Sequence, residues 1–323
     1  MKRFEHSSAT SVQEAVKLLS ASNARALAGG TDLTMIMKDG LLPTDRVVDL
    51  KAIPGLDQIK EEDGELRLGA MARLADVAAS SLVAQKAPAL ALAAALVASP
   101  QIRNMATLGG NLAQKSRCWY YRDADRSDCY KRNGTYCYAV FGASDVHAIF
   151  DGAACFAVHP SDTAVALSAL DARVVVAGPE GHRVVGVDSF FIGPDVDYTR
   201  EMALAQDEII TEVRVPSTSL GSSSVFLKAA PRRSIDFARG SVAALVVGSP
   251  VIQRARITLG AVAPTPRRAT DAESWLEGKR LEPSVIAKAA ELAVAGARPL
   301  GSNAYKIDLI QGLVRQALAR LAG

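Results

Sequence analysis

The chain has 323 residues, of which 49% are hydrophobic and 22% charged. This composition is ordinary for a folded globular protein and excludes wholesale disorder, while the length is about twice that of a typical domain and predicts two. Thirty-seven Lys and Arg residues against 34 Asp and Glu residues give a formal net charge of +3. So small a charge does not favour a nucleic acid or a membrane surface as partner, so we expect a small-molecule ligand.

The longest uncharged apolar run covers residues 87–100. A membrane-spanning helix needs about 20 apolar residues, so the sequence predicts no membrane span. The first fifteen residues lack the apolar segment and cleavage site of a secretory signal, and we therefore expect folding in the cytoplasm. A partner subunit with a twin-arginine signal could still carry the folded chain to the periplasm.

The first hundred residues predict a mixture of helices and strands. Ser11 and Glu14 form a capping box, and apolar residues at helical spacing follow it, which predicts a helix ending near residue 21. The alanine-rich stretch 74–98 predicts two helices, the second starting at Pro88. Further predicted elements are strands at 25–28 and 46–50, a helix beginning at 33–38, and a hairpin at 59–68 that turns at Asp63-Gly64.

The second half of the chain predicts a further mixed unit after a serine-rich boundary at 217–224. Before the boundary we expect a helix at 165–170 and strands at 173–176 and 208–215. After it we expect strands at 225–229, 242–247 and 256–261 and helices at 272–277, 283–297 and 305–321. The expected fold class is α+β.

Two glycine turns stand out, Gly29-Gly30 and Gly109-Gly110, each followed by a small polar residue, Thr31 or Asn111. Consecutive glycines let backbone N–H groups converge on phosphate oxygens. Neither turn has the spacing of a Walker or Rossmann loop, and a single Gly-Gly pair is more often only a tight turn. The turns alone therefore leave both interpretations open.

The phrases around these turns are more specific. AGGTDL at 28–33, TLGGNL at 107–112 and HPSD at 159–162 resemble, in order, the FAD-binding segments of the flavoprotein subunit of the xanthine oxidase family, the molybdenum hydroxylases. The resemblance covers nearly the whole chain. It continues through FFIG at 190–193, EII at 208–210, FLK at 226–228, DFA at 236–238 and GAVAPTPRR at 260–268.

The resemblance implies an α+β fold with a two-part FAD-binding domain of the vanillyl-alcohol oxidase and p-cresol methylhydroxylase type at 1–216. A smaller α+β domain would follow at 217–323. FAD would be bound without a covalent link, and its pyrophosphate and ribityl chain would be surrounded by Ala28, Gly29, Gly30, Thr31, Asp32, Thr107, Gly109, Gly110 and Asn111.

Four further residues receive roles from the resemblance. Asp162 would bind a flavin or ribose hydroxyl, Ile209 or Ile210 would pack near the isoalloxazine, and Lys228 would influence the flavin electrostatically. For Asp162 and Lys228 the alternative is a solvated surface charge.

All four cysteines of the chain, Cys118, Cys129, Cys137 and Cys155, lie in one segment. Four thiolates are the ligands of a 4Fe-4S cluster or of a structural zinc. The long spacings favour a cluster, because four-cysteine zinc sites usually contain a short C-x2-C or C-x4-C pair. Zinc and ordinary buried thiols remain alternatives, and His147 could replace a thiolate only if the four cysteines were incomplete.

The segment 114–158 stands as an insertion between the second glycine turn and the aspartate motif. This arrangement is similar to the flavoprotein subunits of 4-hydroxybenzoyl-CoA reductase and of bacterial molybdenum aldehyde oxidoreductases, which carry an additional 4Fe-4S cluster there. RCWYYRD at 117–123 and CYKRN at 129–133 look closer to the aldehyde type. Its aromatic residues would shield a cluster and its cations, including Arg117 and Lys131, would offset the charge, or both would form a protein interface.

The resulting hypothesis is an electron-transfer subunit that carries FAD and a 4Fe-4S cluster and has no catalytic acid or base of its own. The resemblance implies a large molybdopterin partner that oxidises the substrate, an aldehyde in the favoured version, and a small partner with two 2Fe-2S clusters. FAD would pass the electrons to an external acceptor. The alternatives are a 4-hydroxybenzoyl-CoA reductase-like enzyme, a free-standing FAD oxidoreductase and a zinc-stapled binding module. We expect four arginines to be solvated or contact residues: Arg232, Arg233, Arg267 and Arg268.

Overall fold

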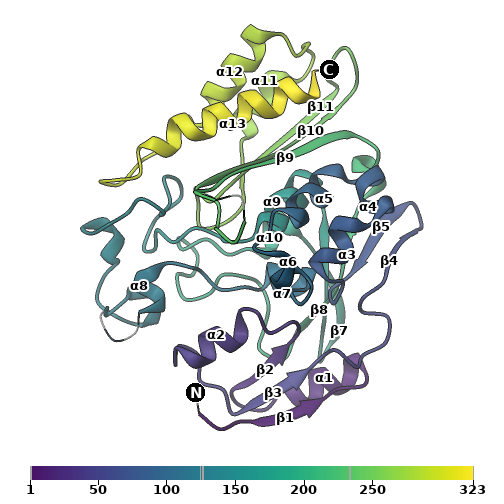
Figure 1. The fold of residues 1–323 in the computed structure, drawn as a ribbon, viewed down its shortest axis with the longest axis vertical. Helices are drawn as coiled ribbons and strands as arrows, with labels where there is room; N and C mark the ends of the chain where they lie inside the picture. The colour runs from purple at the N-terminus through teal and green to yellow at the C-terminus, as the bar shows by residue number, and fades with distance from the viewer. Residues whose placement is uncertain (1, 124, 126, 233, 323) are drawn as a thin grey trace.

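Figure 1 shows the chain as three sheets stacked along the long axis of the molecule, with helices between and above them. The structure is a computed structural model and describes residues 2–123, 125, 127–232 and 234–322. The sheets are mixed with helices throughout, so the expected α+β fold class is confirmed.

The N-terminal part is a small parallel sheet in the order β1 (Glu5–Ser8), β3 (Arg46–Asp49), β2 (Ala24–Leu27). Helix α1 (Val12–Leu19) begins at Ser11, whose side chain accepts the Glu14 N–H, as the capping box predicts. Helix α2 (Leu33–Lys38) follows the first glycine turn. Strand β1 was not predicted, because its sequence EHSS has no apolar residue and its pairing comes from β3.

The second part is a five-stranded antiparallel sheet in the order β4 (Ile59–Glu62), β5 (Glu65–Gly69), β8 (Ile209–Val215), β6 (Arg173–Gly178), β7 (Gly181–Gly186). Its β4–β5 hairpin is the predicted one. Because β5 pairs with β8, more than a hundred residues later, the chain returns to the same sheet after the helices and the cysteine segment.

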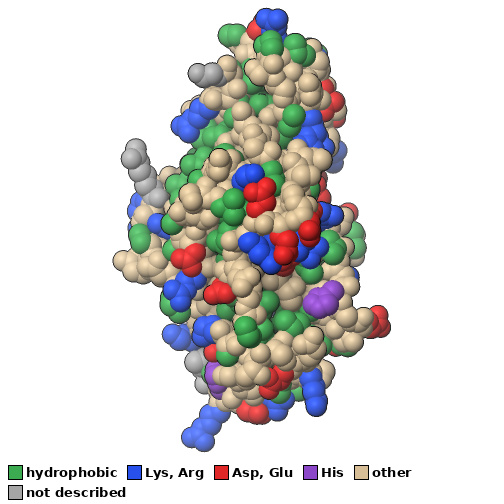
Figure 2. Space-filling view, turned by 90° about the vertical axis from the view of Figure 1, so that its right-hand side faces the viewer, with side chains coloured by type: hydrophobic (Ala, Val, Ile, Leu, Met, Phe, Trp, Pro, Cys, Tyr) green, Lys and Arg blue, Asp and Glu red, His purple; other side chains and the backbone are tan. Residues whose placement is uncertain are grey.

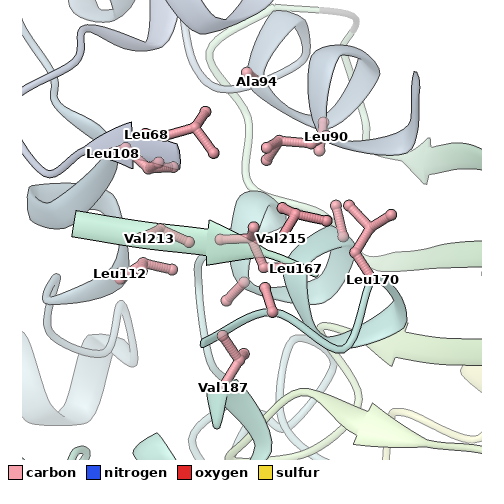
Figure 3. Packing of buried hydrophobic residues seen from close by; sticks show 14 of the residues in the cluster. Leu68, Leu90, Ala94, Leu108, Leu112, Leu167, Leu170, Val187, Val213 and Val215 are labelled. Atoms are coloured by element: carbon pink, nitrogen blue, oxygen red, sulfur yellow. The ribbon is translucent and has the colours of Figure 1, made fainter. Parts of the chain in front are cut away.

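The helices of this part form the main core with the sheet (Figure 3). Two helices were predicted at 74–98, but the structure has three. A new helix begins after Ser80, whose side chain accepts the Val83 N–H as an N-cap. The helices are α3 (Leu74–Ala79), α4 (Ser81–Lys86), α5 (Pro88–Ala95), α6 (Pro100–Arg103), α7 (Leu108–Leu112), α9 (Asp162–Ala169) and α10 (Val187–Phe190).

The C-terminal part is an antiparallel sheet in the order β12 (Arg267–Arg268), β11 (Arg254–Gly260), β10 (Gly240–Val247), β9 (Ser223–Ala229). Helices α11 (Thr270–Leu276), α12 (Pro283–Ala293) and α13 (Tyr305–Leu321) cover one face (Figure 1). The other face sends Phe226, Ala243 and Leu245 into the main core. Both faces are therefore buried, which explains the nearly continuous apolar sequence of β10.

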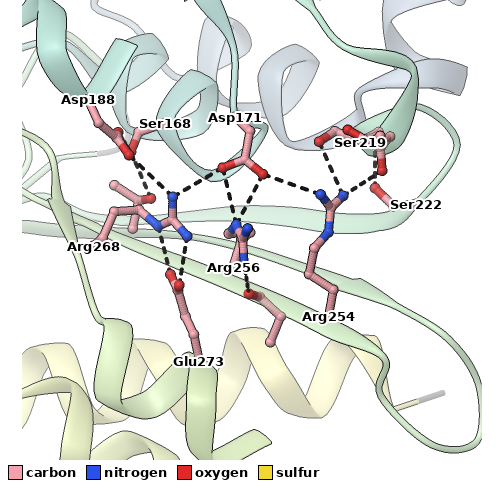
Figure 4. A network of polar contacts seen from close by, with 12 residues as sticks. Ser168, Asp171, Asp188, Ser219, Ser222, Arg254, Arg256, Arg268 and Glu273 are labelled. Atoms are coloured by element: carbon pink, nitrogen blue, oxygen red, sulfur yellow. Dashed lines mark hydrogen bonds and ion pairs between the residues drawn. The ribbon is translucent and has the colours of Figure 1, made fainter. Parts of the chain in front are cut away.

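A polar network joins the C-terminal sheet to the second part (Figure 4). Asp171, just after α9, accepts hydrogen bonds from Arg256 at 3.1 Å and Arg268 at 3.2 Å, and Arg268 also pairs with Glu273. The arginines expected to be solvated or in contacts thus make contacts within the chain: Arg268 in this network, Arg267 with Asp151 and Arg232 with Asp236. Arg233 lies outside the described residues.

The serine-rich segment 217–224 is ordered rather than an extended linker. Ser219 is buried in a turn at Ser217–Ser219, and the Ser224 hydroxyl accepts the Ala89 N–H at 3.2 Å. The segment therefore packs onto the second part, and the domain boundary placed there stays a prediction.

Positive and negative side chains are mixed on the face shown in Figure 2. Within the described ranges, no helix has both the length and the apolar character needed to cross a membrane.

Candidate cofactor sites

A cleft of about 470 Å³ lies between the two glycine turns, the start of α9 and the end of β9. Pockets that bind small molecules typically have volumes of this order. Residues predicted from the sequence make up much of its wall: Ala28, Gly29, Gly30, Thr31, Asp32, Thr107, Gly110, Asn111, Asp162 and Lys228. Gly109, Ile209 and Ile210 are not part of that wall.

The two glycine turns touch each other, and glycine is needed for this contact. A Cβ atom on Gly29 would lie 1.9 Å from the Met105 carbonyl oxygen, which no side chain can tolerate. Gly109 packs in the same way, because its Cβ would lie 2.8 Å from the Ala70 Cβ. These two glycines therefore bring backbone segments together and do not simply leave space for a ligand.

The turns differ in their free backbone N–H groups. Within the part of the chain that the structure describes, the N–H groups of Gly29, Gly30, Thr31 and Asp32 have no hydrogen-bond acceptor. The N–H groups of the second turn already have acceptors within the protein: Leu108 donates to Ala72, Gly109 to Ala70, Gly110 to the Thr107 hydroxyl, and Asn111 to the Thr107 carbonyl. Only the first turn therefore offers a row of donors to a phosphate.

The Asp32 carboxylate is bonded to the cysteine segment. It accepts the Lys115 N–H at 2.8 Å and lies 2.9 Å from a guanidinium nitrogen of both Arg117 and Arg122. The sequence pattern predicted contact of Asp32 with the cofactor and gave no indication of this anchoring. Asp32 thus links the first glycine turn to the residues on either side of Cys118.

Asp162 and Lys228 form an ion pair of 2.7 Å with both side chains buried. Lys228 also donates to the Leu96 carbonyl at 3.0 Å. Burial raises the pKa of Asp162, and the Lys228 ammonium opposes that shift. Neither residue is a solvated surface charge, so that alternative is excluded.

Asn111 fixes the start of α9, where Asp162 is the first residue. The Asn111 side-chain oxygen accepts hydrogen bonds from the hydroxyls of Ser161 at 2.6 Å and Thr163 at 2.7 Å. The second glycine turn therefore holds the Asp162 carboxylate in place at the cleft.

Ile209 and Ile210 lie side by side on β8, away from the cleft wall. Ile209 belongs to the core of the N-terminal part and Ile210 to the main core. Their burial is explained by this packing, and the position near the isoalloxazine that the resemblance gives to one of them stays a prediction.

The cysteine segment is mostly irregular, with one short helix, α8 (Trp119–Arg122), and two short 3-10 turns at Tyr130–Arg132 and Tyr138–Val140. Besides Asp32, a second carboxylate holds it. Glu201 accepts the Ser116 N–H at 3.1 Å and pairs with Lys131 at 3.4 Å. Although burial alone would raise it, Lys115 and Lys131 keep the pKa of Glu201 low. The sequence motifs did not identify Glu201.

The four thiols are neighbours. Burial raises the pKa of Cys118 to about 12, and the nearby thiols of Cys155 and Cys129 add to the shift. Burial raises the pKa of Cys155 to about 11, with Cys137 and Cys129 contributing. The backbone groups of Tyr121 and Tyr120 oppose the rise in the pKa of Cys118, and that of Ala157 opposes the rise in the pKa of Cys155. Across the described ranges, however, no group of three or more His, Cys, Asp or Glu side chains is arranged to hold a metal ion.

Aromatic rings of the cysteine segment contact one another. Tyr120 stacks on Tyr138, Tyr138 stacks on Tyr136, and Trp119 meets the His147 ring edge-on at 5.3 Å. The His147 Nε2 atom lies 3.2 Å from the Cys118 sulfur. His147 is thus a direct neighbour of one thiol. The sequence analysis gave His147 no necessary role as a ligand, because four cysteines are present.

The matches to known proteins agree with this geometry. Residues 2–218 match the family described as the FAD binding domain in molybdopterin dehydrogenase, and residues 225–321 match the CO dehydrogenase flavoprotein C-terminal domain. The chain is 36% identical to the aldehyde oxidoreductase FAD-binding subunit PaoB of Escherichia coli, covering 99% of this chain and 98% of that one. It is 31% identical to the carbon monoxide dehydrogenase medium chain of Hydrogenophaga pseudoflava, covering 98% and 96%.

Solved structures show the same fold. A carbon monoxide dehydrogenase from Hydrogenophaga pseudoflava has a TM-score of 0.77 at 30% identity, over 98% of this chain and 96% of that one. Quinoline 2-oxidoreductase from Pseudomonas putida has a TM-score of 0.77 at 26% identity, over 100% and 98%.

Fold and cleft together define an FAD-binding subunit of an oxidoreductase. The chain belongs to the family of FAD-binding medium subunits of the molybdenum hydroxylases, of the carbon monoxide dehydrogenase and aldehyde oxidoreductase type. The resemblance seen in the sequence is confirmed at this level.

Proposed function

We propose that FAD lies in the cleft with its pyrophosphate on the first glycine turn. The observation that carries this proposal is the row of unused N–H groups from Gly29 to Asp32 at the cleft wall. The residues fit the group, because the donors suit phosphate oxygens and the apolar wall, including Met35 and Ile102, suits a ring. The opposite side of the cleft would be formed by Thr107, Gly110 and Asn111. Gly109 would support this side from behind, where it packs against Ala70.

The Asp162 and Lys228 pair would supply the polar end of this site. Because Asp162 is already paired with Lys228, its carboxylate can accept a hydrogen bond from a cofactor hydroxyl without being left as an unpaired charge in the interior. The ammonium of Lys228 would at the same time favour negative charge that develops on a bound flavin. The second glycine turn contributes by holding Asp162 through Asn111.

We further propose that Cys118, Cys129, Cys137 and Cys155 hold a 4Fe-4S cluster. The electrostatic interaction among the thiols and their low solvent exposure support it, since limited solvent access tunes clusters of this kind. An iron–sulfur core is several atoms wide, so its ligands stand further apart than those around one ion. This favours a cluster over a single zinc ion in a segment with no compact ligand group among its described residues.

We place the chain in a complex with a large molybdopterin subunit and a small subunit carrying two 2Fe-2S clusters. The support is that the relatives are named as FAD-binding or medium subunits. Bound FAD would supply two-electron redox chemistry between these partners and an external acceptor. Aldehyde oxidation is the favoured reaction, because the relative at 36% identity is an aldehyde oxidoreductase subunit.

The test is to purify the native complex and to measure flavin, iron and molybdenum. We expect one FAD and about four iron atoms per copy of this chain in addition to the iron of the partners. Cys155→Ser should remove that iron and leave the flavin, because the cleft wall contains no cysteine. The matched control is Ala154→Ser, which adds the same hydroxyl one position earlier. Zinc in place of iron would contradict the cluster, and a complex without flavin would contradict the cleft assignment.

A further inference from the structure

An open hollow of about 480 Å³ lies on the surface of the cysteine segment, in the lobe around α8 at one side of the molecule (Figure 1). Its wall consists of four aromatic rings and one glycine: Tyr120, Tyr136, Tyr138, Phe141 and Gly142. We call it the aromatic hollow. It shares no lining residue with the FAD cleft and contains none of the four cysteines, so neither proposed cofactor explains it.

The rings of the hollow contact one another but remain uncovered. Tyr138 stacks on Tyr120 at 5.7 Å and on Tyr136 at 4.4 Å between ring centres, and Phe141 meets Tyr136 edge to face at 6.4 Å. Phe141 is nevertheless 85% exposed and Tyr136 45% exposed. Rings that served only to shield the interior from water would be covered. A group of exposed apolar rings is instead typical of a binding surface.

The hollow is free of positive charge. No lysine or arginine is found in its wall among the described residues. The cations that the structure describes in residues 114–158 make contacts within the chain instead: Lys115, Arg117, Arg122, Lys131 and Arg132. Since the faces of aromatic rings carry negative partial charge, a positive ligand meets attraction here and no repulsion.

A carboxylate adds to this negative character. The Asp128 N–H donates to the Tyr138 hydroxyl at 3.2 Å, which places Asp128 at the phenolic end of that ring. The pKa of Tyr136 is raised, mainly by the neighbouring Tyr138 hydroxyl and further by the Asp128 charge. The Asp128 carboxylate accepts the Thr135 N–H at 3.2 Å, and no cation pairs with it in the part of the chain that the structure describes. The hollow therefore favours a cation over an anion.

The polar atoms of the hollow indicate which kind of cation fits. Two of its three tyrosine hydroxyls are already engaged, since Tyr120 donates to the Ala143 carbonyl at 3.2 Å and Tyr138 accepts the Asp128 N–H. A primary ammonium on such a surface would lose hydrogen bonds to water and gain few in return. A quaternary ammonium has no N–H to leave unpaired, and aromatic cages bind ions of this type.

We propose that the aromatic hollow binds a small organic cation with a quaternary ammonium group, on the exposed faces of Tyr136 and Phe141. Asp128 would raise the affinity through its charge, without contact with the ligand. The inference goes beyond the proposed function, because it involves neither the FAD cleft nor an electron-transfer step.

The test uses choline as the probe, with the full chain and with the native complex. Saturation-transfer NMR of the choline methyl protons, followed as a titration, gives the dissociation constant. The reference ligand is dimethylbutanol, which has the shape of choline with carbon in place of the charged nitrogen. We expect choline to bind at least tenfold more tightly than this neutral molecule, because ring faces attract the charge and not the shape.

Three variants locate the site. Phe141→Leu keeps an apolar side chain and removes one ring face, so the choline Kd should rise about two- to thirtyfold, the range for one cation–π contact. Asp128→Asn keeps an acceptor for the Thr135 N–H and should raise that Kd about two- to fivefold, an effect that high salt removes. The control Phe4→Leu makes the same change at a ring that is 38% exposed and outside the hollow, and should leave binding unchanged.

The outcomes decide the proposal without reference to flavin or iron. Equal affinity for choline and dimethylbutanol would show an apolar hollow with no preference for charge, and the proposal would fail. It would also fail if the full chain bound no choline, or if Phe141→Leu bound it as well as the wild type. Binding to the full chain that disappears in the native complex would mean that a partner subunit covers the hollow, which contradicts a site for a free cation.

Discussion

The FAD cleft and the cysteine segment lie side by side but are held in different ways. The cleft is built from backbone contacts: Gly29 against Met105, the internal hydrogen bonds of the second glycine turn, and Asn111 at the start of α9. The cysteine segment has little regular structure and is held by two partly buried carboxylates, Asp32 and Glu201. The cleft is therefore held by the backbone of the chain itself, whereas the segment relies on side-chain anchors and, on our proposal, on its metal.

This difference has a thermodynamic consequence. A metal that binds the folded segment and not the unfolded chain adds its binding free energy to the stability of that segment. A cleft that backbone contacts already hold gains less order from its ligand. Changes in the cleft should thus affect flavin and fold together, and changes in the anchors should affect iron first.

The largest effect is expected for Gly29→Ala. The new methyl group would need space 1.9 Å from the Met105 carbonyl oxygen, so the two turns must separate. Overpacking of this kind costs about 1–3 kcal/mol, occasionally more. We expect bound flavin to fall to less than a tenth of the wild-type content, measured by absorbance after purification, with a lower free energy of unfolding.

Gly186→Ala is the matched control. Gly186 has an ordinary φ of −60° and no atom near the position of an added Cβ, so flavin and stability should stay unchanged. Normal flavin content in Gly29→Ala would show that the contact between the turns is not needed to form the cleft.

The sequence predicted the cleft better than the anchors for a physical reason. Glycine turns, capping residues and apolar periodicity are local patterns, and the short phrases at 28–33 and 107–112 carry them. The contact of Asp32 with Arg117 and Arg122 joins residues more than eighty positions apart. The fold decides which cation a carboxylate contacts. The sequence therefore indicated neither the pairing of Asp32 with these arginines nor the role of Glu201.

The fold shows the same limit. Strands with alternating or continuous apolar residues, such as β6 and β10, were predicted close to their bounds. Strand β1 has no apolar residue and depends on pairing with β3, a contact 41 residues away in register. The sequence motif places Ile209 or Ile210 near the isoalloxazine, which stays a prediction, and it gave no indication that the two residues pack into two different cores.

A smaller effect, confined to the cysteine segment, is expected for Asp32→Asn. The variant keeps the shape of the side chain and removes the charge that faces Arg117 and Arg122. Hydrogen bonds to charged groups contribute about 1.5–3 kcal/mol, and the side chain is only 14% exposed, so the anchor should weaken measurably. We expect reduced iron content and faster loss of iron to a chelator, with at least half of the flavin retained.

Asp151→Asn is the corresponding control, since Asp151 also pairs with an arginine, Arg267, but at an exposed site outside both cavities. Surface pairs contribute about 0–1 kcal/mol, and iron should not change. If Asp32→Asn lost its flavin and kept its iron, Asp32 would belong to the cofactor site rather than to the anchor.

The smallest expected effect concerns His159, which lies in the HPSD phrase between the two regions. Burial lowers its pKa from 6.5 to about 4, and Glu201 opposes the shift. Between these values the unfolded chain binds a proton that the folded chain does not, so stability falls as the pH falls through this window. From pH 7 to pH 5.5 this one residue should account for a loss of about 1 kcal/mol in the free energy of unfolding.

Denaturant unfolding at both pH values measures this loss. His159→Gln should show a smaller loss than the wild type by that amount, whereas His182→Gln, on the exposed edge strand β7, should match the wild type. Equal pH dependence in all three proteins would mean that His159 is solvated, and that the interior between the FAD cleft and the cysteine segment is more open to water than its burial indicates.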